Sequence, residues 1–91
     1  MDEFELRKIM LMQQFIYDYK SGGISLNVFV QKIEALISVL GREEFLARVD
    51  PIAMDLEVIN ATLLDEGRGP TDDENRALSR AISDLEEIFV G

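Results

Sequence analysis

The sequence contains no cysteine, no histidine and no tryptophan. Without cysteine, there is no disulfide framework and no thiolate site for a metal ion. Without histidine, the chain lacks the side chain that most often acts as acid–base catalyst and metal ligand near neutral pH. No apolar run approaches the ~20 residues of a membrane span, and the first residues are acidic where a signal peptide is basic. These absences predict a cytoplasmic, non-enzymatic protein that needs no cofactor and binds no metal.

The charge of the chain is concentrated in its second half. The formal net charge is −9 over 91 residues. Positions 50 to 91 contain eleven acidic residues against three arginines, and so carry about −8 of that total. Because summed negative charge attracts a positive partner and repels nucleic acid and anionic membranes, this distribution predicts a basic protein as the partner. We expect a monomer in a one-to-one complex with that partner rather than a homo-oligomer.

The distribution of apolar residues predicts four helices. Nearly half of the residues are apolar, at 47%, which is enough for one small folded domain spanning residues 1–91. Apolar positions recur at helical intervals in residues 3–20 and 26–40, after Asp50-Pro51, and in residues 72–89. A short extra helical turn is expected at residues 44–49, before Pro51 begins the third helix. The predicted fold is an all-α, small four-helix bundle.

Capping signals set the expected helix boundaries. Asp2 with Glu5, and Thr71 with Glu74, have the spacing of a capping box. The segment 67–70 is rich in glycine and proline and predicts the loop before the last helix. The remaining signals are glycines that end helices and one N-cap serine: Gly22, Gly23, Gly41 and Ser25.

Each expected helix has an apolar face. The first has Phe4, Leu11, Phe15 and Tyr19, joined by Met12 and Ile16. The third has Ile52, Leu56, Ile59 and Leu63, and the last has Leu78, Ala81, Ile82, Leu85 and Phe89. The third helix also carries a second apolar set roughly 160° away around its axis: Met54, Val58 and Ala61. That second set needs another neighbour, which leaves open an alternative function as an acidic helical adaptor or homodimerisation module.

The acidic residues around the last two helices form the candidate partner-binding surface. Asp65 and Glu66 close one helix, and Glu86 and Glu87 close the other, where the macrodipole disfavours negative charge. The alternative is that these are solvated surface carboxylates without a binding role, some of which stabilise the positive N-terminus of the last helix. The candidate residues are Asp55, Asp65, Glu66, Asp72, Asp73, Glu74, Asp84 and Glu87.

The other polar residues are expected to have structural roles or to lie in solvent. Arg76 and Arg80 have the spacing to pair with Asp73 and Asp84 along one helix face. Tyr17 projects away from the apolar face of its helix and is expected to be exposed. Carboxylate pairs such as Asp84 with Glu87 lie on polar faces, where nothing desolvates them, so we expect no catalysis. The segment also lacks the ligand spacing of an EF-hand.

Residues 15–37, which read FIYDYKSGGISLNVFVQKIEALI, carry a family resemblance. Their pattern of a helix, then Gly-x-Ile-Ser, then a phenylalanine-rich helix resembles the opening of colicin D immunity-like proteins and related immunity proteins of contact-dependent growth inhibition systems. The matching residues are Gly23, Ile24, Ser25 and Phe29. The resemblance implies a four-helix protein that blocks the nuclease domain of a toxin made by the same bacterial cell, often a tRNase. Its acidic residues would stand in for RNA phosphates.

Overall fold

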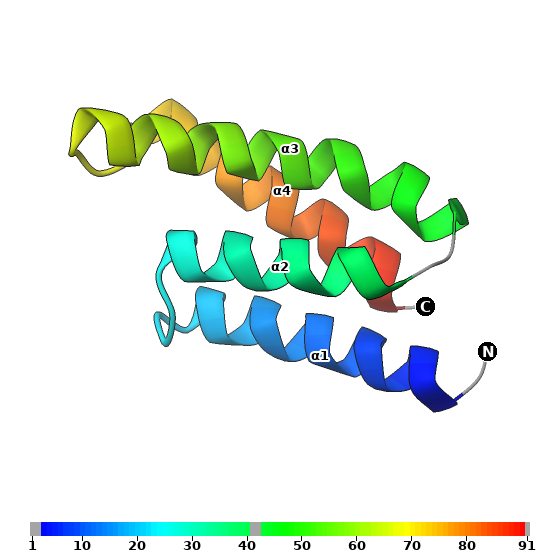
Figure 1. The fold of residues 1–91 in the computed structure, drawn as a ribbon. Helices are drawn as coiled ribbons and strands as arrows, with labels where there is room; N and C mark the ends of the chain where they lie inside the picture. Colours follow the sequence, from blue (N-terminus) through cyan, green and yellow to red (C-terminus); the bar gives the residue numbers. More distant parts are fainter. Residues whose placement is uncertain (1–2, 41–42, 91) are drawn as a thin grey trace.

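The computed structural model describes residues 3–40 and 43–90, and these form four helices with no strand within those ranges. The helices are α1 (Glu3–Lys20), α2 (Leu26–Leu40), α3 (Glu43–Glu66) and α4 (Asp72–Val90). They lie side by side as a small four-helix bundle (Figure 1). The predicted fold class is confirmed.

The bundle is a closed ring of neighbours. α1 packs against α2 and α4, and α3 packs against the same two helices. The α1–α2 turn and the α3–α4 loop lie at one end of the bundle, while the start of α1 and the end of α4 lie at the other (Figure 1). Consecutive helices are therefore antiparallel, and α1 and α3 occupy opposite corners. The molecule measures 42 × 24 × 19 Å along its principal axes.

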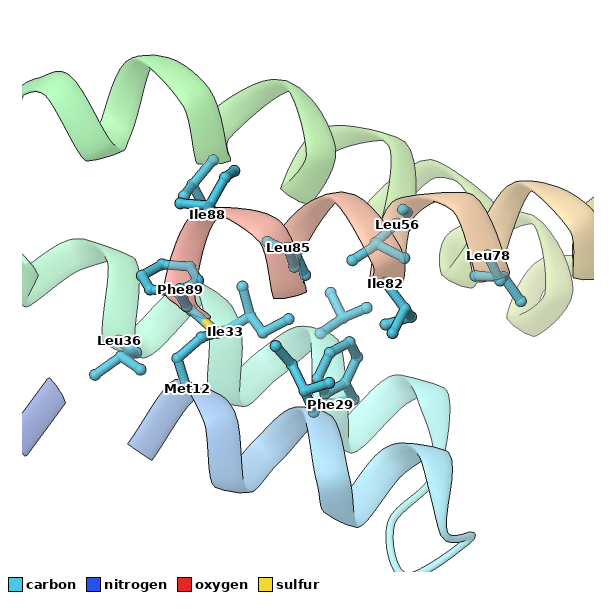
Figure 2. Close-up of a cluster of buried hydrophobic side chains, with 14 residues drawn as sticks. Met12, Phe29, Ile33, Leu36, Leu56, Leu78, Ile82, Leu85, Ile88 and Phe89 are labelled. Carbon is cyan, nitrogen blue, oxygen red and sulfur yellow. The ribbon is translucent and has the colours of Figure 1, made fainter. Parts of the chain in front are cut away.

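The core lies between the four helices and draws side chains from all of them (Figure 2). Every core residue predicted for α4 is buried, and Ile88 joins them. Tyr19 of α1 stacks on Phe29 of α2, with ring centroids 4.8 Å apart. The largest fully buried side chains are Phe29, Met12, Ile33, Leu56, Leu85 and Val49.

The buried face of α1 is rotated from the predicted one. Met12 and Ile16 are buried, whereas Phe15 is half-buried and Phe4 is 65% exposed. Lys8 lies nearly buried between them, where its ammonium group is 3.6 Å from the centroid of the Phe4 ring. The ammonium also donates to the carbonyl of Val39 in the last turn of α2, a turn whose carbonyls lack partners within the helix. This contact is consistent with the observed rotation of α1, which buries Met12 and Ile16 in the core.

α3 does not begin at Pro51. Residues 44–49 are helical as expected, but they belong to one continuous helix with Pro51 in its interior. Proline removes one helical hydrogen bond and disfavours helical geometry in the preceding residue. Val49 and Leu56, on either side of the proline, are both buried in the same core, and Pro51 itself faces solvent. Packing outweighs the local preference, so the expectation of an N-cap at Asp50 was wrong.

The turn into α2 follows the predicted signals in part. Gly22 has a positive φ of 82°, which a side chain would strain, whereas Gly23 does not adopt a positive φ. Ser25 is the N-cap of α2, because its hydroxyl accepts a hydrogen bond from the backbone N–H of Val28 at 3.2 Å. The expected cap at Asp2 and the expected stop at Gly41 lie outside the described residues.

Candidate acidic interface

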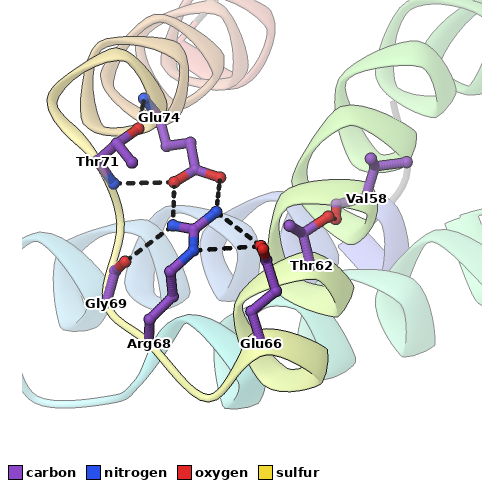
Figure 3. Close-up of polar contacts among 7 residues, drawn as sticks. All are labelled: Val58, Thr62, Glu66, Arg68, Gly69, Thr71 and Glu74. Carbon is purple, nitrogen blue, oxygen red and sulfur yellow. Dashed lines mark hydrogen bonds and ion pairs between the residues drawn. The ribbon is translucent and has the colours of Figure 1, made fainter.

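The loop between α3 and α4 is organised around Arg68 (Figure 3). Its guanidinium donates to Glu66 at 2.8 Å and to Glu74 at 2.7 Å, and it also donates to the carbonyl of Gly69 at 3.1 Å. Gly67, with a φ of +62°, turns the chain out of α3 so that Arg68 points back between the two carboxylates. One base thus pairs with two of the predicted site residues, and the three side chains together keep one negative charge.

Glu74 also closes the predicted capping box. The backbone N–H of Thr71 donates to the Glu74 carboxylate at 2.8 Å, and the N–H of Glu74 donates to the Thr71 hydroxyl at 3.1 Å. The hydrogen bonds from Arg68, and next the one from the Thr71 backbone, lower the pKa of Glu74 to about 2. The same pairing raises the pKa of Arg68. Glu74 is therefore a structural residue of the α4 N-terminus.

The eight predicted site residues divide into two groups. Glu66 and Glu74 bind Arg68, and Asp73 binds Arg76 three residues along α4. The remaining five side chains are exposed and form no ion pair with any other described residue: Asp55, Asp65, Asp72, Asp84 and Glu87. Among the eight, only the carboxylates of this second group have no ion pair within residues 3–40 and 43–90. Asp72 also lies in the first turn of α4, where the helix dipole stabilises it.

Each acidic helix end has one neutralised carboxylate and one free one. At the end of α3, Glu66 pairs with Arg68 while Asp65 is exposed. Near the end of α4, Glu86 pairs with Lys20 of α1 at 3.2 Å while Glu87 is exposed. The unfavourable contact with the macrodipole is therefore offset for half of these acids, and it persists at Asp65 and Glu87.

A shallow groove of about 360 Å³ runs between α3 and α4. Asp55 of α3 and Asp84 of α4, which are 29 positions apart in the sequence, both line it. Arg80 lines it as well, but the predicted pair of Arg80 with Asp84 is not formed. The floor and the remaining wall are apolar: Ile52, Val58, Ile59, Ala77 and Ala81. The fold thus brings two carboxylates that form no ion pair with a described residue onto one partly apolar groove, which Arg80 also lines.

The second apolar set of α3 lies beside this groove and has no neighbour within the bundle. Met54 and Val58 are each 63% exposed, and Ala61 is exposed as well. Val58 also lines the groove, so the exposed apolar side chains and the carboxylates form one continuous surface. We call this surface the α3–α4 face, defined by Met54, Asp55, Val58 and Asp84.

Two polar contacts between α2 and α3 were not predicted from the sequence. Asn60, which is nearly buried, donates from its side-chain amide to the amide oxygen of Asn27 at 2.9 Å. Further along, Glu34 of α2 lies close to Glu57 of α3, and the pKa of Glu34 is raised by partial burial and then by repulsion and hydrogen bonding with Glu57. The only signal for Asn60 was a polar residue between Leu56 and Leu63 on an otherwise apolar face.

Among residues 3–40 and 43–90, no group of three or more acidic side chains is arranged to hold a metal ion. None of the four helices, over the residues described, combines the length and the hydropathy needed to cross a membrane.

No protein-family model, curated protein sequence or solved structure matches this chain. The resemblance in residues 15–37 therefore depends on those residues alone. In the structure, Gly23 and Ile24 belong to the turn before α2, Ser25 caps that helix and Phe29 is buried. Each of these positions has a structural role, so they bear on the fold rather than on the partner.

Proposed function

We propose that this protein is a non-enzymatic immunity protein that binds and neutralises the basic nuclease domain of a toxin through its α3–α4 face. The observation that carries the proposal is the convergence of Asp55 and Asp84, both exposed and without an ion pair among the described residues, on one groove with an apolar floor. The resemblance of residues 15–37 to immunity proteins supports the four-helix fold of that class, and the charge of the α3–α4 face supports a basic partner.

The α3–α4 face has the make-up of a protein interface. Stable interfaces commonly have an apolar centre that excludes water and a polar rim that sets register. Met54 and Val58 supply exposed apolar area, and Asp55 and Asp84 supply charge beside it. A lysine or arginine of the partner would find two carboxylates that no base among the described residues pairs with.

The charge distribution also suits a nuclease as partner. Nuclease active sites carry positive charge, because they bind the phosphates of nucleic acid. A partner of opposite charge is steered toward an acidic surface, and electrostatic steering raises association rates to about 10⁸–10⁹ M⁻¹s⁻¹ at low salt. Rapid capture would protect a cell that makes the toxin.

A second function, an adaptor that docks a partner helix on α3 without any nuclease, is favoured by one observation only. That observation is the exposure of Met54 and Val58, for which the bundle offers no neighbour. An adaptor of this kind would bind through apolar contacts and would be insensitive to salt. Salt dependence therefore separates the two proposals.

The test is affinity purification from the native cells followed by a cleavage assay. Tagged protein is loaded with lysate at low salt, eluted with a salt gradient, and the eluted proteins are identified by mass spectrometry. We expect a basic nuclease that elutes late and whose cleavage of RNA or DNA is abolished by an equimolar amount of the protein. Recovery of a partner without nuclease activity, or of a nuclease that the protein leaves active, would contradict the proposal.

A charge-reversed variant, Asp55→Lys with Asp84→Lys, assigns the surface. Both residues lie on exposed faces in helix interiors and make no ion pair with the described part of the chain, so the fold should tolerate the change. The matched control is Asp18→Lys with Glu34→Lys, which alters net charge equally on α1 and α2. Inhibition should be lost in the first variant and retained in the second, and equal inhibition by both would remove the assignment to the α3–α4 face.

A further inference from the structure

The outer face of α1 carries a regular seam that the proposed function does not use. Its residues are spaced alternately three and four apart, which is the spacing of a coiled-coil contact line. They are Glu3, Leu6, Met10, Gln13, Tyr17 and Lys20. All six are exposed, and Met10 and Tyr17 are exposed by 61% and 66%. We call this line the α1 seam.

The α1 seam is also neutral in a strongly acidic chain. α1 contains three acids and three bases, whereas α4 contains six acids against two arginines. Two copies of a chain with a net charge of −9 repel each other over most of their surfaces. The repulsion is weaker where α1 of one copy faces α1 of another than where α3 or α4 does, and half of the exposed large apolar side chains of the described residues lie on α1.

We propose that the α1 seam binds the α1 seam of a second copy of this chain, antiparallel and about a two-fold axis. With the axis at the height of residues 11 and 12, Glu3 meets Lys20 of the second copy and Leu6 meets Tyr17. Met10 meets Gln13 at the centre. Each contact occurs twice, as two-fold symmetry requires.

The two ends of the seam carry opposite charges, and this specifies the antiparallel arrangement. A parallel arrangement would place Glu3 against Glu3 and Lys20 against Lys20, and it would also align the two helix dipoles unfavourably. In the antiparallel arrangement, Glu3 lies between its own Arg7, at 3.2 Å, and Lys20 of the second copy. Lys20, which already contacts Glu86 at 3.2 Å, gains a second carboxylate. Both ends thereby form small ion-pair networks, which contribute more than isolated surface pairs.

A groove lies where the second copy would insert its leucine. The groove has a volume of about 520 Å³, it runs between α1 and α4, and Gln13, Tyr17 and Lys20 of the seam line it. Its lining is mostly apolar. Gln13 is held in place because its amide donates to the carbonyl of Phe89 at 2.6 Å. Leu6 of the second copy, opposite Tyr17, is positioned to cover this groove.

The dimer would leave the α3–α4 face open. α1 and α3 occupy opposite corners of the bundle, so the seam and the residues Met54, Asp55 and Val58 are on different sides of the molecule. This arrangement differs from the monomer that the net charge alone predicted, and it predicts one toxin domain bound by each copy of a dimer. The two proposals concern different surfaces and are tested separately.

Sedimentation equilibrium from micromolar to millimolar concentration tests the dimer. We expect the mass to rise from 10.3 kDa toward twice that value in the wild type. Glu3→Lys and Lys20→Glu should each raise the dissociation constant about tenfold, because each substitution acts twice in a two-fold dimer. Combining the two substitutions restores opposite charges between copies and should bring the constant back to near the wild-type value. Circular dichroism melts of all four proteins control for unfolding.

Cross-linking tests the antiparallel register. Because the chain has no cysteine, Leu6→Cys and Tyr17→Cys each introduce a single thiol. Mixing the two variants under mild oxidation should give a disulfide-linked heterodimer, and neither variant alone should cross-link comparably. A monomer at every concentration would overturn the proposal, as would a dimer insensitive to both charge substitutions. Cross-linking of Leu6→Cys to itself in preference to Tyr17→Cys would overturn the antiparallel register.

Discussion

α1 and α4 are neighbours of similar length, with 18 and 19 residues, yet their outer faces are opposite in character. Of the large hydrophobic side chains that are exposed among the described residues, half belong to α1 and none belongs to α4. Those of α1 are Phe4, Leu6, Met10, Leu11 and Tyr17. In α4, the described large apolar side chains are buried by the bundle and the outer face is polar. In α1, the inner face is buried in the core, but the outer face leaves apolar area exposed to water.

Under our two proposals, this difference separates two kinds of contact on one small bundle. Strong like charge on α3 and α4 opposes contact between copies and attracts a basic protein. Neutrality and apolar exposure on α1 permit contact between copies. A chain of this size, with one core and four helix exteriors, can assign different exteriors to different partners without enlarging the fold.

The largest expected effect on stability is a difference between substitutions on the inner and the outer face of α1. Met12→Ala on its inner face should lower the free energy of unfolding by about 2–5 kcal/mol, and Leu85→Ala on α4 should do the same, because both side chains are fully buried. Met10→Ala, two positions away on the outer face, should change it by no more than about 0.5 kcal/mol in dilute monomer. Urea unfolding measures all three, and a large loss in Met10→Ala would mean that the outer face packs within the bundle.

A smaller effect is expected at the start of α4. Thr71→Ala removes the hydroxyl that accepts a hydrogen bond from the N–H of Glu74, and should cost about 0.5–2 kcal/mol. Ser25→Ala at the N-cap of α2 is the matched control, because Ser25 accepts from Val28 in the same way but has no capping-box glutamate. We expect the greater loss in Thr71→Ala, as measured by thermal unfolding. Equal losses would show that the Thr71 hydroxyl contributes no more within a capping box than the Ser25 hydroxyl contributes without one.

The pairing of Glu74 with Arg68 should appear in the pH dependence of stability. Because the pKa of Glu74 is lowered from 4.5 to about 2 in the folded state, its contribution is complete above pH 4.5 and disappears as the pH falls through 2. Glu74→Gln should therefore be less stable than wild type at pH 7, and the difference should narrow between pH 4.5 and pH 2. Urea unfolding across that range measures it, and a difference independent of pH would contradict the assigned pairing.

The smallest effect on stability is expected between α2 and α3, at the contact of Glu34 with Glu57. The raised pKa of Glu34 means that its charge opposes folding, so stability from this group is present at acid pH and is lost as the pH rises through the raised pKa. Glu34→Gln should slightly stabilise the protein at pH 7, and the gain should disappear at acid pH. Thermal unfolding at the two pH values gives the comparison. A loss of stability at pH 7 would show that Glu34 does not repel Glu57.

The sequence was sufficient to predict the bounds of α2 and α4 and the buried face of α4. Their bounds and the α4 core followed from regular apolar spacing and clear caps, such as Ser25 and the pair Thr71 and Glu74. α3 was less predictable, because local rules place a boundary at Pro51, and only burial of Val49 and Leu56 in one core keeps the helix continuous. Packing between distant segments is not visible in a local pattern.

The candidate site was predictable in composition but not in pairing. The sequence indicated eight acids, but which of them are neutralised depends on where Arg68 and Lys20 reach in the folded chain. Arg68 was discernible as a base between Glu66 and Glu74, whereas the approach of Lys20 to Glu86 joins residues 66 positions apart. The rotation of α1 was missed because a lysine on the apolar side of a helix is not an expected core residue, and Lys8 is nearly buried there.

The most direct test of the central claim is affinity purification with three baits in parallel: wild type, Asp55→Lys with Asp84→Lys, and Glu3→Lys. The first substituted bait alters the α3–α4 face and the second alters the α1 seam. We expect a basic nuclease to be recovered with wild type and with Glu3→Lys, and to be lost with the bait altered at Asp55 and Asp84. Recovery of the same nuclease by all three baits, or of no nuclease by any, would contradict the assignment of partner binding to the α3–α4 face.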